Sequence, residues 1–457
     1  MKTKFTAFIL CIAAFGMQAQ TNPAITSWLQ NDSIKGSHYV QGNSTVVQDN
    51  DLANVQKVQY SASFVYINTN GIPAYPTGPF LDGNRSLATA QNAIFKFPLN
   101  PSKNTGALDV TTGGNIGIFI NGVALFDYRD GVSYNLRQAA DKGGPSGGRG
   151  DGVWNRDAVP AEMDGFDCSK GHPAMGNYHH HQNPSSFKLD KTVLSTICNL
   201  YDAEGLYTMD STKHSPLIGY AYDGFPIYGA YGYADTNGTG GIVRIKSSYK
   251  LRNISVRTHY ADGSNVSDGP AVNTTYPLGH YREDYEFNTA NGHLDEHNGR
   301  FCVTPEYPNG IYAYFCTVDE NWNSAYPYAV GPTFYGNWER RNETTISETV
   351  EVYAPAADTS KNDTNTSVFD NNTPLQLDFN VFPNPAQDFI AVQAMGLVKN
   401  TIQLELVSMK GDVVRISTIS QGTTIWYIDT KTLYDGKYVL RMIDGEQVST
   451  KKIVLQK

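Results

Sequence analysis

The chain has 457 residues, of which 17% are charged and 12% aromatic, and it contains 42 glycines and 29 tyrosines. This composition is that of a globular, turn-rich protein with two or three domains, and it excludes disorder and coiled coil. The net charge of −9 leaves no basic surface for nucleic acid or anionic lipid.

The first nineteen residues have the pattern of a secretory signal peptide. Lys2 and Lys4 give a positive start, residues 5–16 an apolar core, and Ala19 a suitable cleavage site. Removing this segment takes away two lysines and no acid, which changes the net charge from −9 to −11. The apolar run is too short for a lasting membrane span, and no other stretch suits one. We therefore expect an exported, soluble protein with no transmembrane segment.

The middle of the chain reads mainly as β-strands. Residues 58–67 have strand-like spacing, and the Asn121-Gly122 dipeptide between two apolar runs is a strong hairpin signal. Residues 217–222 suit a buried strand, and 189–202 is the one stretch considered for a short helix. The glycine-rich loop at 141–152 lacks the Gly-Lys-Ser/Thr ending of a phosphate-binding loop, so we interpret it as a lid or turn.

Residues 171–184 contain four of the ten histidines of the chain. Side chains alternate along a strand, so His179 and His181 are expected on one face and His180 on the other. With His172 a few residues upstream, these two imidazoles can present nitrogen ligands to one metal ion. A histidine-rich surface loop that only forms hydrogen bonds is the alternative.

The composition changes again near the C-terminus. Residues 354–374 are rich in Ala, Asp, Thr, Ser and Asn and are predicted to be a linker. Beyond it, six or seven short strands over about eighty residues predict a small antiparallel β-sandwich. The expected fold is therefore mainly β, with a large β-rich domain, a linker and this sandwich.

Four cysteines remain after the signal peptide: Cys168, Cys198, Cys302 and Cys316. An even number in an exported chain predicts two disulfides, and three connectivities are possible. Pairing of nearest neighbours, Cys168–Cys198 and Cys302–Cys316, is our hypothesis. Thiolate ligation of zinc is the alternative, and it is less expected in an oxidising compartment.

The C-terminal region resembles the sorting domain of the type IX secretion system of Bacteroidetes. The resemblance rests on Val381-Phe-Pro-Asn-Pro-Ala386, Gly436-Lys-Tyr-Val-Leu-Arg441 and a lysine-rich last strand. It implies handling by the type IX secretion machinery, passage across the outer membrane, removal of the domain, and release or attachment at the cell surface.

Residues 50–336 resemble the YHYH domain family. The motif stands as Tyr178-His179-His180-His181, so His180 replaces the second tyrosine of the family. Further family segments match at 215–229, 294–299 and 326–331. The resemblance implies the fold family and leaves the chemistry open, because no activity is established for it. The predicted domains are a signal peptide at 1–19, a YHYH domain at 20–353, a linker at 354–374 and a sorting domain at 375–457.

His172, His179 and His181 are the predicted metal ligands. Supporting candidates near other family segments are His214, Asp223 and His280. His293 and His297 rank lower because they lie beside acids in what reads as a surface turn, and His38 and His259 are expected to be unrelated. An imidazole-rich set without thiolates suits copper or zinc, whereas calcium and magnesium need oxygen ligands.

Three functions are compatible with these observations. The first is an extracellular copper- or zinc-binding protein. The second is a metal-dependent enzyme such as a hydrolase, with Asp223 or Glu296 as a general base beside an open coordination position. The third is a carbohydrate-binding or adhesive surface module, which would show an exposed aromatic platform. We favour the first.

Overall fold

The computed structural model describes residues 22–31, 33–43, 45–144, 147–184, 206–207, 209–338, 342–355, 379–382, 386–394, 401–408, 412–419, 425–444 and 447–456. The chain divides into two units, Met1–Ser360 and Lys361–Lys457, and each is described by itself. The predicted signal peptide, the helix considered at 189–202 and most of the predicted linker lie outside the described residues. The predicted domain bounds stay predictions.

Strands dominate the first unit, and its helices are short. Within the described residues of this unit, the helices are α2 (Pro23–Thr26) and α3 (Ala158–Ala161), with 3-10 turns η2 (Met163–Gly165), η5 (Arg282–Asp284) and η6 (Thr289–Asn291). In α2, Pro23 stands at the first helical position and the Asn22 side chain accepts a hydrogen bond from the Ala24 amide, which is a favourable start for a helix.

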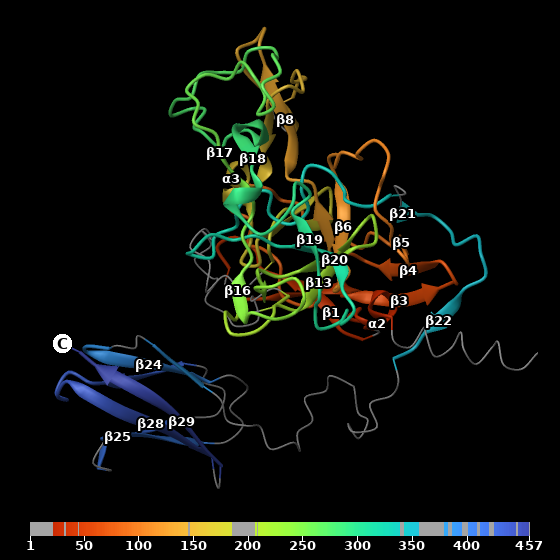
Figure 1. The fold of residues 1–457 in the computed structure, drawn as a ribbon. Coiled ribbons are helices and arrows are strands. Elements are labelled where there is room, and N and C mark those ends of the chain that lie inside the picture. Colours follow the sequence, from red (N-terminus) through yellow and green to blue (C-terminus); the bar gives the residue numbers. More distant parts are fainter. Residues whose placement is uncertain are drawn as a thin grey trace, which may run out of the picture. The chain divides into compact units, whose positions relative to one another are not determined.

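The largest sheet has eight strands in the order β11-β12-β7-β6-β13-β14-β20-β19. Figure 1 labels β6, β13, β19 and β20 of this sheet. Their bounds are β6 (Asn115–Phe119), β7 (Ala124–Phe126), β11 (Gly171–Ala174), β12 (Asn177–His180), β13 (Leu217–Ala221), β14 (Pro226–Tyr228), β19 (Gly299–Cys302) and β20 (Ile311–Phe315). The hairpin around Asn121-Gly122 is confirmed, because β6 pairs with β7 in antiparallel fashion and Gly122 has a φ of 81°. β11 and β19 are the two edge strands.

A five-stranded sheet in the order β21-β5-β4-β3-β22 faces this sheet. Its strands are β3 (Val55–Tyr60), β4 (Phe64–Thr69), β5 (Ala93–Pro98), β21 (Asn342–Glu343) and β22 (Glu351–Tyr353). One apolar cluster joins the two sheets, with Val58 and Phe97 from the smaller sheet and Ile118 and Tyr220 from the larger. Each such buried side chain contributes roughly 1.5–3 kcal/mol, so this interface holds the larger sheet in place.

The strand-like stretch at residues 58–67 forms parts of two strands. A tight turn after Tyr60 divides it into β3 and β4, because the Ser61 amide donates to the Phe64 carbonyl and the Phe64 amide donates to Ser61 Oγ. The serine hydroxyl stabilises this turn locally.

Smaller sheets complete the first unit. They are the pair β1 (Lys35–His38) and β2 (Val47–Leu52), the sheet of β8 (Arg129–Asn135), β9 (Ala140–Gly143) and β10 (Asn155–Asp157), the pair β15 (Tyr231–Tyr233) and β16 (Ile242–Arg244), and the pair β17 (Tyr249–Leu251) and β18 (Tyr285–Phe287). Part of the glycine-rich loop at 141–152 thus belongs to β9, and the rest follows it.

The second unit forms two antiparallel sheets around one core. The sheets are β23-β24-β27 and β26-β25-β28-β29. Their strands are β23 (Phe379–Phe382), β24 (Phe389–Ala394), β25 (Ile402–Ser408), β26 (Val413–Ile419), β27 (Ile425–Asp429), β28 (Gly436–Asp444) and β29 (Gln447–Leu455). Ile390 and Ile428 from one sheet share an apolar cluster with Leu404 and Leu440 from the other. The mainly β fold with a small antiparallel C-terminal sandwich is confirmed.

No helix within the described residues has both the length and the apolar character needed to cross a membrane.

Candidate metal centre

The central histidines lie at one edge of the eight-stranded sheet, on the hairpin of β11 and β12. The two strands are antiparallel, and their register places His172 directly opposite His179. Met175 and Gly176 connect them with φ values of 51° and 86°, the positive values of the tight turns that suit two-residue hairpins. At Gly176 a side chain has no room, since an added Cβ would lie 2.1 Å from Thr89 Oγ1. The turn therefore fixes the register that brings the two histidines together.

Alternation along β12 places the remaining histidines as predicted. His179 and His181 face His172, and the three imidazoles form a buried cluster in which every ligand atom lies within 4.8 Å of the others. His181 Nε2 is 3.1 Å from His179 Nε2 and 3.4 Å from His172 Nε2. His180 points away from this cluster, and its Nε2 lies 2.9 Å from the hydroxyl of Tyr75.

Two ring nitrogens of the cluster are held by the backbone. His179 Nδ1 donates to the carbonyl of Asn177 over 2.9 Å, and His181 Nδ1 donates to the carbonyl of Asp127 over 2.6 Å. A proton fixed on Nδ1 leaves the Nε2 lone pair free to bind a cation, and such outer partners orient the ligands of metal sites. The Asp127 carbonyl reaches the cluster because β12 pairs with β7, whose end it follows.

Aromatic rings pack around the imidazoles. The Phe126 ring stacks on His179 with centroids 3.7 Å apart and an interplanar angle of 14°. The Phe166 ring meets His172 edge-on at 4.9 Å. Burial, followed by the neighbouring charges of His181 and His172, lowers the pKa of His179 well below its usual value, so this imidazole is neutral at neutral pH.

Glu162, which no sequence pattern indicated, lies beside the cluster. It follows α3 directly, and its Oε2 lies 3.3 Å from His172 Nε2 and 3.2 Å from His181 Nε2. Burial raises the pKa of this carboxyl, but the two imidazoles outweigh burial and bring it below its usual range. Burial lowers the pKa of His181. The hydrogen bond and the negative charge of Glu162 raise it by more, so the pKa of His181 lies above its usual value. The Glu162 side chain is 26% exposed, more than the three buried histidines, although its Oε2 atom is itself buried.

The two His–His distances around His181 Nε2 match the edge length of a tetrahedral metal site. His181 Nε2 lies between 3.1 and 3.4 Å from His179 Nε2, Glu162 Oε2 and His172 Nε2. Four donors about 2.0–2.1 Å from a tetrahedral zinc ion are about 3.3 Å apart, because that is the edge of the tetrahedron. The residues present therefore can hold a metal ion.

The supporting candidates do not join this cluster. His214 Nδ1 donates to the carbonyl of Ser215 over 2.7 Å, and His280 Nε2 lies 2.7 Å from Asp141 Oδ2. Asp223 is fully buried, and its Oδ2 accepts hydrogen bonds from the Tyr314 hydroxyl and the Gly336 amide. Within the described residues, the group of side chains with the spacing of metal ligands consists of His172, His179 and His181.

The lower-ranked histidines also have partners of their own. His297 is buried, in contrast to the predicted surface turn, and its Nδ1 lies 2.7 Å from Thr333 Oγ1. Partners of the others are Lys246 for His293, Asp49 for His38 and Thr258 for His259.

The predicted Cys302–Cys316 disulfide is wrong. Both side chains are buried, free thiols. The β19–β20 register pairs Cys302 with Ile311, so Cys316, just past the end of β20, lies five residues further along the chain, roughly 16 Å at the rise of a strand. Cys168 is buried, and Cys198 lies outside the described residues, so that pairing stays a prediction.

A cavity of about 350 Å³ lies next to the segments that carry Glu162 and His181. Its lining includes Ala161 and Met163, the two neighbours of Glu162, and Gln182, which follows His181. His280 lines the same cavity, so this candidate lies near the site without being one of its donors.

Comparison with protein families matches two regions of the chain. Residues 94–327 match the model of the family described as YHYH protein, and residues 380–456 match the model described as secretion system C-terminal sorting domain. No curated protein matches the chain. The sorting domain indicates export by the type IX secretion system to the cell surface or beyond it. Since the first match covers half of its length, the chain belongs to the YHYH protein family.

Proposed function

We propose that this exported protein binds one transition-metal ion through His172, His179 and His181, with Glu162 as the fourth protein group at the site. The observation that carries the proposal is the placement of His181 Nε2 between 3.1 and 3.4 Å from the three other donor atoms. Lone pairs at this spacing repel one another unless protons or a cation lie among them. A metal ion satisfies all of them together.

Zinc is the proposed metal, and copper is the second candidate. A square-planar Cu²⁺ site with bonds of about 2.0 Å would place neighbouring donors about 2.8 Å apart, below the spacing found around His181. The His–His spacing around His181 and the three imidazole donors of the cluster suit zinc. Calcium and magnesium are disfavoured because they require mostly oxygen ligands.

A metal-dependent hydrolase is the second candidate function, and Glu162 favours it. Its side chain is 26% exposed and lies beside the cluster, and the adjoining cavity borders the residues on both sides of it. A bound zinc ion would polarise a carbonyl group or a water molecule. In this role the Glu162 carboxylate would accept a proton, whereas Asp223, the base suggested by the sequence, is occupied by Tyr314.

Metal analysis of the purified protein, produced without affinity histidines, tests the proposal. We expect one zinc ion per wild-type chain and none in the His179→Ala/His181→Ala variant, which should stay folded by circular dichroism. His259→Ala is the matched control, because this histidine is exposed and lies outside the cluster. A wild-type protein that takes up neither zinc nor copper at micromolar concentration would overturn the proposal.

Glu162→Gln separates the two candidate functions. If Glu162 is a ligand only, the variant binds zinc more weakly, and a panel of ester, peptide and phosphoester substrates detects no hydrolysis by the wild type. If Glu162 is a general base, zinc stays bound in the variant and a hydrolysis measured for the wild type is lost.

A further inference from the structure

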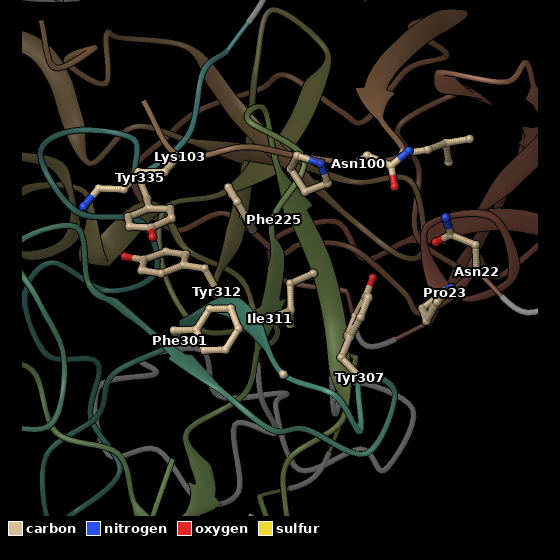
Figure 2. Close-up of a pocket in the computed structure, with 13 residues that line it drawn as sticks. Asn22, Pro23, Asn100, Lys103, Phe225, Phe301, Tyr307, Ile311, Tyr312 and Tyr335 are labelled. Atoms are coloured by element: carbon tan, nitrogen blue, oxygen red, sulfur yellow. The ribbon is translucent and has the colours of Figure 1, made fainter. Parts of the chain in front are cut away.

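A second site lies at the other edge of the eight-stranded sheet, away from the histidine cluster. β11 is one edge strand and carries His172, whereas β19 is the opposite edge strand. Beside β19 lies a cavity of about 650 Å³, a volume typical of small-molecule sites. Its lining residues are Asn22, Pro23, Leu99, Asn100, Pro101, Lys103, Phe225, Phe301, Tyr307, Gly310, Ile311, Tyr312 and Tyr335 (Figure 2).

Aromatic rings form two sides of this cleft. Figure 2 shows Phe301, Tyr312 and Tyr335 on one side and Tyr307 on the other. Tyr335 stacks on Tyr312 with centroids 3.5 Å apart and an interplanar angle of 2°. Tyr312 is itself fixed, since it is buried and its hydroxyl donates to Asp295 Oδ1. The stacked pair is therefore a rigid surface.

Phe301 is exposed in a way that core packing does not explain. Its side chain is 63% exposed, while Cys302, the next residue of β19, is buried. Its ring lies against Gly310, where an added Cβ would be 2.8 Å from Phe301 Cε1, so the ring rests on backbone. A large apolar ring held at the rim of a cleft is characteristic of a binding surface.

The charge of the cleft is opposite to that of the chain. Lys103 is the one charged residue among those lining it, and no acid is present, although the chain has a net charge of −9. Lys103 Nζ lies 5.4 Å from the ring centroid of Tyr335, so the cation lies near the aromatic surface. Asn100 is exposed and adds an amide that can both donate and accept hydrogen bonds.

We infer that this cleft binds an acidic saccharide, a chain of pyranose units that carry carboxylates. The C–H face of a pyranose is electropositive and stacks on the negative face of an aromatic ring, which the exposed Phe301 provides. The Asn100 amide forms hydrogen bonds with the sugar hydroxyls, and the Lys103 ammonium forms an ion pair with one carboxylate. A single lysine suits one carboxylate per bound unit rather than the several charges of a nucleotide polyphosphate. The site is separate from the histidine cluster and does not depend on a metal ion there.

Calorimetric titration of the whole protein with oligogalacturonate and with its neutral methyl ester tests the inference. Both are measured with a chelator present, so that an empty histidine site does not affect the result. We expect the acid to bind at least about tenfold more tightly than the ester, because one charge-assisted contact contributes about that much. Added salt should weaken binding of the acid.

Variants assign the binding to the cleft. Phe301→Ala should weaken binding of both ligands by about tenfold through loss of stacking. Lys103→Gln should weaken binding of the acid alone. Tyr434→Ala is the matched control, because Tyr434 is 86% exposed and belongs to the second unit. The inference is overturned if the acid does not bind, if acid and ester bind equally, or if Phe301→Ala binds as the wild type does.

Discussion

His179 and His180 are neighbours in the chain, yet they lie on opposite faces of β12 and have different partners. His179 Nε2 lies 3.1 Å from His181 Nε2, whereas His180 Nε2 lies 2.9 Å from the Tyr75 hydroxyl. Tyr178 shares the face of His180, and its hydroxyl donates to the buried carboxylate of Asp167. Alternate residues of the motif thus present ligands on one face and anchor the hairpin on the other.

This alternation predicts opposite effects for two adjacent alanine substitutions. His179→Ala should lower zinc affinity by more than about 100-fold, since even the outer partners of metal ligands contribute 10- to 100-fold. His180→Ala should retain zinc and lose about 2–4 kcal/mol of stability, because a buried ring and its hydrogen bond are removed. Competition with a chromophoric chelator and urea unfolding measure the two effects. Equal loss of zinc in both variants would contradict the assignment.

The turn of the hairpin should control the site as well. Gly176→Ala places a Cβ against Thr89 at a φ of 86°, so both strain and a steric clash are expected. Gly42→Ala is the control, because Gly42 has a φ of 80° and no atom within 4 Å of an added Cβ. Gly42→Ala should cost about 1–2 kcal/mol and leave zinc binding unchanged. Gly176→Ala should cost more and weaken zinc binding; unchanged zinc affinity would contradict a role of the turn in setting the register.

Asp223 should make stability depend on pH. Burial raises the pKa of this carboxyl to about 6, above its value in an unfolded chain. Its stabilising contribution is therefore complete below about pH 4 and is lost as the pH rises through about 6. Relative to Asp223→Asn, which stays neutral, the free energy of unfolding of the wild type should fall by about 3 kcal/mol between pH 4 and pH 7. Urea unfolding of both proteins at each pH measures this difference in the free energy of unfolding. A difference that does not change with pH would refute the prediction.

Thiol titration should distinguish the two halves of the predicted disulfide framework. Cys302 and Cys316 are buried free thiols, and burial raises the pKa of Cys316 to about 12, so neither should react in the folded protein. After denaturation without reductant, two thiols per mature chain should react. If four thiols react, the predicted Cys168–Cys198 bond is absent. If no thiol reacts, Cys302 and Cys316 are not free thiols.

Local patterns were sufficient for much of the fold and for three residues of the site. Asn121-Gly122 identified the β6–β7 hairpin, and the period of two along β12 separated His179 and His181 from His180. Both signals lie within a few residues and depend only on backbone geometry.

The other features of the site, and the separation of the two cysteines, depended on contacts between distant segments of the chain. Glu162 lies after a four-residue helix with no periodic pattern, and it reaches the cluster only through the packing of α3. The Asp127 carbonyl accepts a hydrogen bond from His181, although the two residues are 54 positions apart in the chain. The pairing of β12 with β7 brings them together. Cys302 and Cys316 looked like a pair by spacing, but the register of β19 and β20 separates them.

Anomalous diffraction from crystals of the zinc-loaded protein, recorded on both sides of the zinc absorption edge, tests metal binding by the histidine cluster most directly. We expect one peak about 2.0–2.1 Å from the Nε2 atoms of His172, His179 and His181. A peak elsewhere in the molecule, or no peak while these imidazoles contact only one another and Glu162, would contradict it.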